Sequence, residues 1–298
     1  MTSTTPAFIR HALYPLLAAA TLAYLAFELT TSRAPLGHHY PVYLGSMILV
    51  LTVVEARWPL RTEWRMTRAT FLRRDLPFLV FGALTIGALQ AVATHLVTAG
   101  AATRGTALAG LPLVPAVILA ILGTDLLWYG MHRYSHEGRG PLGRWLWRVH
   151  AAHHLPPQVY VLMHAVAHPI NTAMVRVLLT VPPFLFGLSP EAVFAAAVIT
   201  GFQGLVSHWN TDSRAGWLNH LLVGTELHRL HHSAELAEAK NYGGTTSLWD
   251  RCFGTYVAPS DPPPRALGIA SPHPFPADTD VVAILRWPLR QPPSEKAD

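Results

Sequence analysis

Long apolar stretches separated by short polar connections fill the first 131 residues of the chain. Four of these stretches approach or exceed the length that a helix, rising about 1.5 Å per residue, needs to cross a hydrocarbon layer about 30 Å thick. We interpret the first as a retained span and not as a cleaved signal peptide, because no cleavage pattern follows it. The stretches predict transmembrane helices over Tyr14–Leu29, Tyr40–Val54, Leu76–Val97 and Ala107–Met131.

A further apolar region, Ile170–Val206, is interrupted by residues that break helices. These residues are Pro182, Pro183, Gly187 and Pro190. We predict two short helices, joined at the prolines, that enter the membrane and return to the same side. A pair of full crossings is the alternative.

The composition supports a membrane protein. Charged residues make up 13% of the chain, about half of the roughly 25% in soluble domains. The net charge of +5 is explained by membrane topology, and no basic patch interleaved with aromatic residues indicates nucleic-acid binding. Because Cys252 is the only cysteine, the chain offers neither an intramolecular disulfide nor a site made of several thiolates.

Arginine placement predicts the orientation. The connection after the second span is rich in arginine, whereas Arg33 and Arg104 stand alone in the other connections. By the positive-inside rule the rich connection faces the cytoplasm, and a basic segment after the fourth span lies on the same side. The preference for arginine over lysine favours a bacterial inner membrane. The two basic segments contain Arg57, Arg61, Arg65, Arg68, Arg73, Arg74 and then Arg133, Arg139, Arg144 and Arg148.

Histidines form three short clusters with helical spacing. Side chains at i, i+3 and i+4 share one face of a helix, so each cluster can direct its imidazoles at a metal ion. A lone histidine is more often an ordinary core or surface residue, but three clusters in one chain indicate a metal site. The clusters are His132 and His136; His150, His153 and His154; and His228, His231 and His232.

Two more histidines, His168 and His208, flank the apolar hairpin and bring the candidate ligands to ten. Ten ligands suit two ions with five or six positions each, whereas two tetrahedral zinc ions need about eight. Iron is therefore favoured, although geometry and ligand type leave zinc open. We interpret His164 and His220 as supporting or surface residues. Five histidines belong to no cluster: His11, His38, His39, His95 and His273.

Other polar residues are candidates to support the ligands. Asp125 and Tyr129 continue the stripe of His132 and His136 along one helix face. Asp125 is expected to accept the second ring N–H of a ligand histidine or to hold a water near it, with a helix-packing hydrogen bond as the alternative. Ligand histidines need such partners, or the polar residues serve as helix caps. Further candidates are Asn210, Asn219, Glu226, Asn241 and Asp250.

Taken in order, these elements resemble the fatty acid hydroxylase and sterol desaturase superfamily over roughly 121–256. The resemblance is carried by the three clusters, by His168-Pro169 and His208 with Asn210, and by Asn241-Tyr242-Gly243 and Leu248-Trp249-Asp250-Arg251. It implies a membrane-embedded di-iron oxygenase with the ten histidines as ligands and O2 as co-substrate. The chain departs from the pattern at Gly224-Thr225-Glu226, where a threonine-proline step is expected.

The resemblance implies hydroxylation of a lipid C–H bond, with desaturation by the same metal centre as the alternative. A membrane lipid is the expected substrate and a separate electron-transfer protein the expected donor; the oligomeric state is left open. Two other classes compete: a metal transporter or metal-buffering membrane protein, and a noncatalytic scaffold. Polar residues are scarce in the first three spans, which disfavours an ion path.

The sequence thus predicts an all-α integral membrane protein. It has about four transmembrane helices, a membrane-inserted helical hairpin and a helical histidine cluster at the cytoplasmic face. We divide it into a transmembrane region (1–110), a catalytic region (111–260) and a proline-rich tail (261–298).

Overall fold

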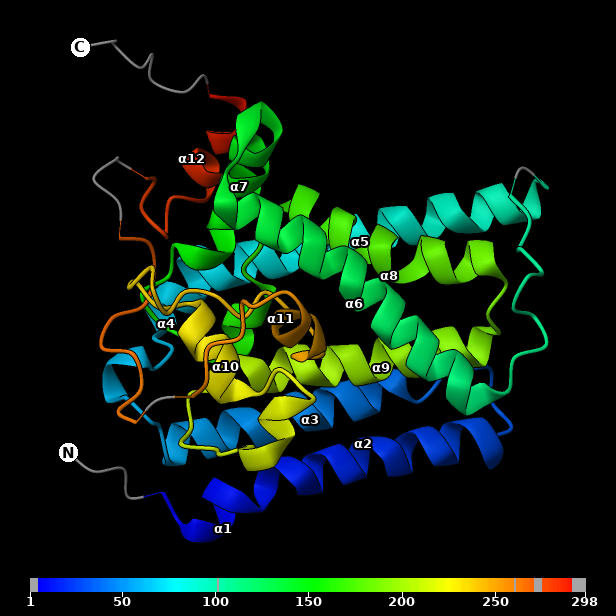
Figure 1. The fold of residues 1–298 in the computed structure, drawn as a ribbon, viewed down its shortest axis with the longest axis horizontal. Helices are drawn as coiled ribbons and strands as arrows, with labels where there is room; N and C mark the ends of the chain where they lie inside the picture. The colour runs from blue at the N-terminus through cyan, green and yellow to red at the C-terminus, as the bar shows by residue number, and fades with distance from the viewer. Residues whose placement is uncertain (1–4, 101, 260, 271–274, 291–298) are drawn as a thin grey trace.

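The computed structural model describes residues 5–100, 102–259, 261–270 and 275–290. These residues form helices and loops without a β-strand, which confirms the predicted all-α class. Six segments are long and apolar enough to cross a membrane, and they lie side by side as a bundle (Figure 1). Their long helices are α2 (Leu13–Thr30), α3 (Tyr40–Arg57), α5 (Leu76–Thr98), α6 (Leu113–Glu137), α8 (Pro169–Phe186) and α9 (Pro190–Ser207).

The largest difference from the predicted spans is in α6, which begins six residues later than expected and extends to Glu137. Pro112 stands at its N-cap, and Gly138 ends it in the left-handed conformation, with φ 60°. Because the helix continues past the apolar stretch, it carries both His132 and His136 on its last two turns.

The hairpin of α8 and α9 differs in detail from the expected one. Pro182 and Pro183 lie inside α8 and do not form the turn. The chain reverses at Gly187, whose φ of 82° is easily reached only without a side chain, and Pro190 begins α9. Each helix has 18 residues and is a candidate span of its own.

Apolar side chains on the outside of the bundle indicate contact with lipid. In α5 only Phe78 is buried, and Leu84 is 65% exposed. Such a surface is unfavourable in water and favourable against acyl chains. Helix α9 is the most buried span and packs against α2 and α6, with Phe202 and Val206 in a hydrophobic core cluster.

Shorter elements gather around one end of the bundle. Two of them carry histidine clusters: α7 (Gly140–His154) and α10 (Thr225–His231). The others are α1 (Ala7–His11), η1 (Thr62–Trp64), α4 (Arg68–Thr70), η2 (Phe71–Asp75), η3 (Val161–Ala165), η4 (Gly216–His220), α11 (Leu248–Cys252), α12 (Val281–Arg286) and η5 (Trp287–Leu289).

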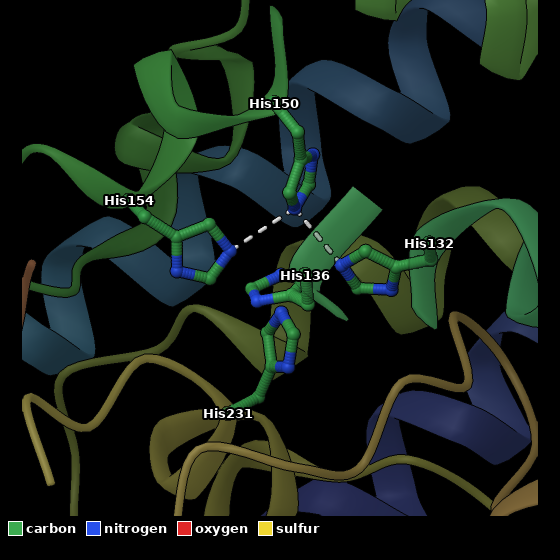
Figure 2. Close-up of side chains that lie close together, drawn as sticks. All are labelled: His132, His136, His150, His154 and His231. Atoms are coloured by element: carbon green, nitrogen blue, oxygen red, sulfur yellow. Dashed lines mark hydrogen bonds between the residues drawn. The ribbon is translucent and has the colours of Figure 1, made fainter. Parts of the chain in front are cut away.

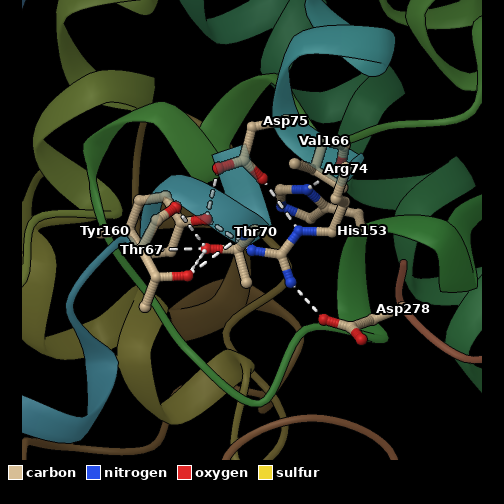
Figure 3. Close-up of polar contacts among 8 residues, drawn as sticks. All are labelled: Thr67, Thr70, Arg74, Asp75, His153, Tyr160, Val166 and Asp278. Carbon is tan, nitrogen blue, oxygen red and sulfur yellow. Dashed lines mark hydrogen bonds and ion pairs between the residues drawn. The ribbon is translucent and has the colours of Figure 1, made fainter. Parts of the chain in front are cut away.

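A buried ion-pair network stabilises the packing of the short elements at this end of the bundle (Figure 3). Arg74 is fully buried and pairs with Asp75 and Asp278, and both Arg74 and Asp75 contact the hydroxyl of Tyr160. The network therefore joins the π-helical turn η2 to the segment before η3 and to the segment before α12. Arg74, which we counted among the topology-setting arginines, is a structural residue.

Candidate metal centre

Nine of the ten predicted histidines converge into two groups. Within each group one nitrogen from every ring lies within 4.8 Å of all the others, and no carboxylate or thiolate of the described residues joins them. The group of five is drawn in Figure 2. The five-histidine group is His132, His136, His150, His154 and His231; the four-histidine group is His153, His208, His228 and His232.

Helical spacing explains only part of the division, because histidines three apart, which we expected to face the same ion, are separated: His150 from His153 and His228 from His231. Residues four apart share a face, so His150 enters the same group as His154, and His228 the same group as His232. Consecutive residues diverge by about 100°, so the His153-His154 pair supplies one ring to each group. The rings of His154 and His232 stack across the boundary with centroids 4.3 Å apart, which makes the two groups direct neighbours.

Backbone carbonyls fix the tautomer of four rings. A carbonyl oxygen only accepts, so the Nδ1 that faces it must carry the proton and the ring's Nε2 must present a lone pair. The four N–H···O bonds run from His132 to Tyr242 (2.7 Å), His231 to Lys240 (2.8 Å), His153 to Val166 (2.9 Å) and His208 to Gly204 (2.9 Å).

These tautomers turn lone pairs toward one another, an arrangement that a metal ion between them would satisfy. The Nε2 atoms of His153 and His208 are 3.0 Å apart, although neither has a proton to share. In the other group, Nε2 of His132 lies 2.9 Å from Nε2 of His150, whose Nδ1 faces Asn171 Oδ1. Two nitrogens about 2.1 Å from one ion and about 90° apart would stand about 3 Å from each other. The rings present therefore fit a metal ion in each group.

Burial keeps the rings neutral, which is the form that binds metal. It lowers the pKa of His231 to about 3 and that of His153 to about 4, because a charged imidazole would lose its water shell. The pKa of His228 and that of His232 also lie well below the usual value, first through burial and then through the charge of neighbouring histidines.

We expect the metal-free protein to lose stability as the pH falls from 7.5 to 5.5. An unfolded histidine titrates near 6.5, whereas the buried rings stay neutral, so below about 6.5 the unfolded state binds more protons and the free energy of unfolding decreases. Thermal unfolding in detergent measures this. His153→Gln should flatten the pH dependence and His38→Gln, at an exposed position, should not; an unfolding temperature that is flat or rises toward pH 5.5 contradicts the expectation.

His168 is the predicted ligand that joins neither group. Its Nδ1 accepts the backbone N–H of Ile170 at the start of α8, and its Nε2 donates to the carbonyl of Leu285, so both nitrogens are engaged in structural hydrogen bonds. His220 lies apart and accepts a hydrogen bond from Arg251. His164, by contrast, lies against the four-histidine group, with its ring 5.0 Å from that of His208. His273 lies outside the described residues.

Among the described residues Asp125 makes no hydrogen bond to a histidine, so the direct contact that we expected is absent and a structural hydrogen-bonding role, the alternative, is observed. Its carboxylate accepts the backbone N–H groups of Gly244, Thr245 and Thr246 and the Thr246 hydroxyl, at 2.6–3.0 Å. It thereby holds the loop whose Tyr242 carbonyl accepts from His132. The support reaches the ligand through the backbone and not through a direct contact.

Asp250 and Asn241 hold the same loop from its other side. Asp250 accepts the N–H groups of Tyr242 and Gly243, and Asn241 donates to the carbonyls of Leu227 and Val257. Asn241, at a φ of 58°, stands between the two carbonyls that accept from His231 and His132.

The other predicted supporting residues contact no ligand histidine through a hydrogen bond. Tyr129 contacts the Thr255 hydroxyl, and Asn210 holds the backbone of Arg61. Glu226 accepts from Ala215 and Asn219. They shape the loops around the two groups. Asn171, which faces His150, was not predicted; its place three residues after His168 was the available signal.

Comparison with known proteins finds a family match for the part of the sequence that carries both histidine groups. Residues 117–255 match the model of the fatty acid hydroxylase family. This part of the chain is similar to that family. The match lies inside the predicted catalytic region and confirms the resemblance inferred from the motifs.

Relatives of the fatty acid hydroxylase region include lipid hydroxylases and desaturases. The chain is 33% identical over 159 residues to ornithine lipid hydroxylase OlsE of Rhizobium tropici, covering 53% of this chain and 46% of that protein. Alkylglycerol monooxygenase of Danio rerio is 33% identical over 48% of this chain and 31% of its own length. A Delta(7)-sterol 5(6)-desaturase of Leptosphaeria maculans is 32% identical over 46% and 36%. The chain thus spans less than half the length of these relatives, and no solved structure matches it.

Proposed function

We propose that the protein is a membrane-bound di-iron oxygenase that hydroxylates a C–H bond of a lipid, using O2 and electrons from a separate protein. The observation that carries the proposal is the pair of neighbouring all-imidazole groups with lone pairs turned inward, within a fatty acid hydroxylase region. The group of five histidines exceeds the four ligands that a tetrahedral zinc ion takes, although the group of four does not. The relatives named as lipid hydroxylases and monooxygenases support a lipid substrate.

The five histidines would hold one iron ion and the four histidines the other. When bound, the two ions supply the redox chemistry that activates O2. The chain's own residues orient the ligands. The backbone carbonyls of Tyr242, Lys240, Val166 and Gly204 keep the rings of His132, His231, His153 and His208 in one tautomer and one orientation. Neutral ligands leave the full positive charge of each ion in the site.

A small cleft beside the five-histidine group is the proposed place for the reacting carbon. It lies between α6, α7 and α8, and its lining combines His132 and His150 with the apolar side chains of Trp128, Met131 and Met174. An acyl or alkyl chain entering from the bilayer between α6 and α8 would meet the ligand rings there, while these side chains exclude water.

The arginine-rich connection supports an active site on the cytoplasmic face. Arg57, Arg65, Arg68 and Arg73 are exposed, and the same connection contacts the metal end through Arg61, which is bonded to Asn210. By the positive-inside rule this end faces the cytoplasm. Together with the preference for arginine, this gives a bacterial inner membrane as the proposed location.

Comparative lipid mass spectrometry tests the proposal. Cells that express the protein should contain a lipid one oxygen heavier than its precursor, whereas cells that express His231→Ala should not. Because one relative is named an ornithine lipid hydroxylase, ornithine-containing lipids are the first class to inspect. A loss of two hydrogens would instead establish desaturation, which the sterol desaturase relative supports. Identical lipid extracts from the two strains would contradict both.

A further inference from the structure

His164 has a buried nitrogen that the metal centre leaves unexplained. Its Nδ1 is shielded from solvent and meets no hydrogen-bond partner among the residues that the structure describes. An unsatisfied buried polar atom is costly and commonly marks a missing water or ion. His168 provides the contrast, because both of its nitrogens have partners. His164 therefore differs from a histidine that serves packing alone.

The ring that carries this nitrogen lies beside the four-histidine group. The His164 and His208 rings are 5.0 Å apart, within the 4.3–6.2 Å range among the four rings themselves. Yet His164 is outside the set whose nitrogens converge within 4.8 Å. It thus lies beside the group, too far out to be one of its converging ligands.

Gly204 creates the room for this approach. A Cβ atom at this position would lie 2.5 Å from Cε1 and 2.9 Å from Nε2 of His164, so the imidazole rests on the bare backbone of α9. The same glycine's carbonyl accepts the Nδ1–H of His208. Gly204 therefore admits one ring while its carbonyl orients the other.

The segment that carries His164 is also fixed to the centre. Two residues after His164, the Val166 carbonyl accepts from His153, and four residues before it Tyr160 contacts the buried Arg74 and Asp75 (Figure 3). The chain between these two anchors is the short turn η3. Because the segment is held at both ends, the ring of His164 has a defined place beside the four-histidine group.

The two groups differ by one histidine, and His164 lies beside the smaller one. We propose that His164 is a positioning residue for the second ion: its free nitrogen hydrogen-bonds the water, or an anion in its place, that completes the coordination of the ion held by His153, His208, His228 and His232. This rests on the proposed metal centre. Through this bond His164 would fix where the exchangeable ligand of the second ion sits.

Azide binding to the cobalt-loaded protein tests the proposal without relying on turnover. We expect His164→Ala to retain two cobalt ions per chain but to bind azide about ten- to a hundredfold more weakly, the effect of one lost hydrogen bond to a charged ligand. His164→Gln, which keeps a hydrogen-bonding group, should restore part of the affinity. Gly204→Ala should weaken azide binding as well, because its Cβ displaces the ring. His168→Ala is the matched control and should bind azide as the wild type does.

The outcomes separate this inference from the proposed function. Unchanged azide affinity in His164→Ala, or no azide binding by the two-cobalt wild type, overturns the role of His164. Loss of one cobalt ion in His164→Ala also overturns it, since His164 would then be a ligand itself. A wild type that binds two ions and azide but oxidises no lipid contradicts the proposed function and leaves the role of His164 standing.

Discussion

His231→Ala should lose one of its two ions on dialysis against a chelator and should produce less than about one hundredth of the wild-type lipid product. The Nε2 of His231 is buried and has no hydrogen-bond partner among the described residues, and its ring lies 4.5–4.8 Å from those of His132, His136 and His154. Removing a residue behind a metal ligand already costs about 10- to 100-fold in affinity or activity, so removing a ligand should cost more. Metal analysis and lipid mass spectrometry on the same preparation measure both effects.

Two matched variants make the result specific. His208→Ala should lose the other ion, because His208 belongs to the four-histidine group. His220→Ala should keep both ions and full product, because His220 lies outside both groups and pairs with Arg251. Retention of two ions and of turnover in His231→Ala would contradict the assignment of the five-histidine group.

The spans and the histidine clusters could be predicted from sequence because both are periodic. An apolar stretch of about 20 residues predicts a helix long enough for a membrane, and α2, α3 and α5 begin within one residue of the predicted starts. Histidines four apart share a helix face, and such pairs do enter the same group. The start of α6 was placed too early because the residues before Pro112 are apolar but not helical.

The partners of the ligands could not be predicted, because most of them are backbone carbonyls. Every residue has a backbone carbonyl, so the residue types of Tyr242, Lys240 and Val166 do not indicate that their carbonyls accept hydrogen bonds from histidines. His164 and His168 show the same limit. We expected His168 at the metal centre and His164 outside it, but His164 lies beside the four rings and His168 caps a helix. The position of His164 depends on its tertiary contact with Gly204, which local spacing does not encode.

Asp125 and Asp250, which we expected to contact the histidines, instead bind backbone N–H groups of the loop that carries the Tyr242 carbonyl. Of the two, we expect Asp125 to have the larger effect. Asp125→Ala should lower the free energy of unfolding by about 3–5 kcal/mol, the range for removing one side of a buried charged contact. It would leave three backbone N–H groups and the Thr246 hydroxyl without their acceptor. For a chain of this size we expect the unfolding temperature to fall by about 5–8 °C.

The same variant should also weaken metal binding at the five-histidine group, because the released loop carries the Tyr242 carbonyl that orients His132. Asp125→Asn keeps one acceptor oxygen and should lose less stability. Thr246→Val removes a single donor from the set, so its loss should be about 1 kcal/mol. Thermal unfolding and metal analysis in detergent would rank the three variants. Wild-type stability and metal content in Asp125→Ala would show that the loop is held without this carboxylate, and that the carbonyl of Tyr242 reaches His132 by its own packing.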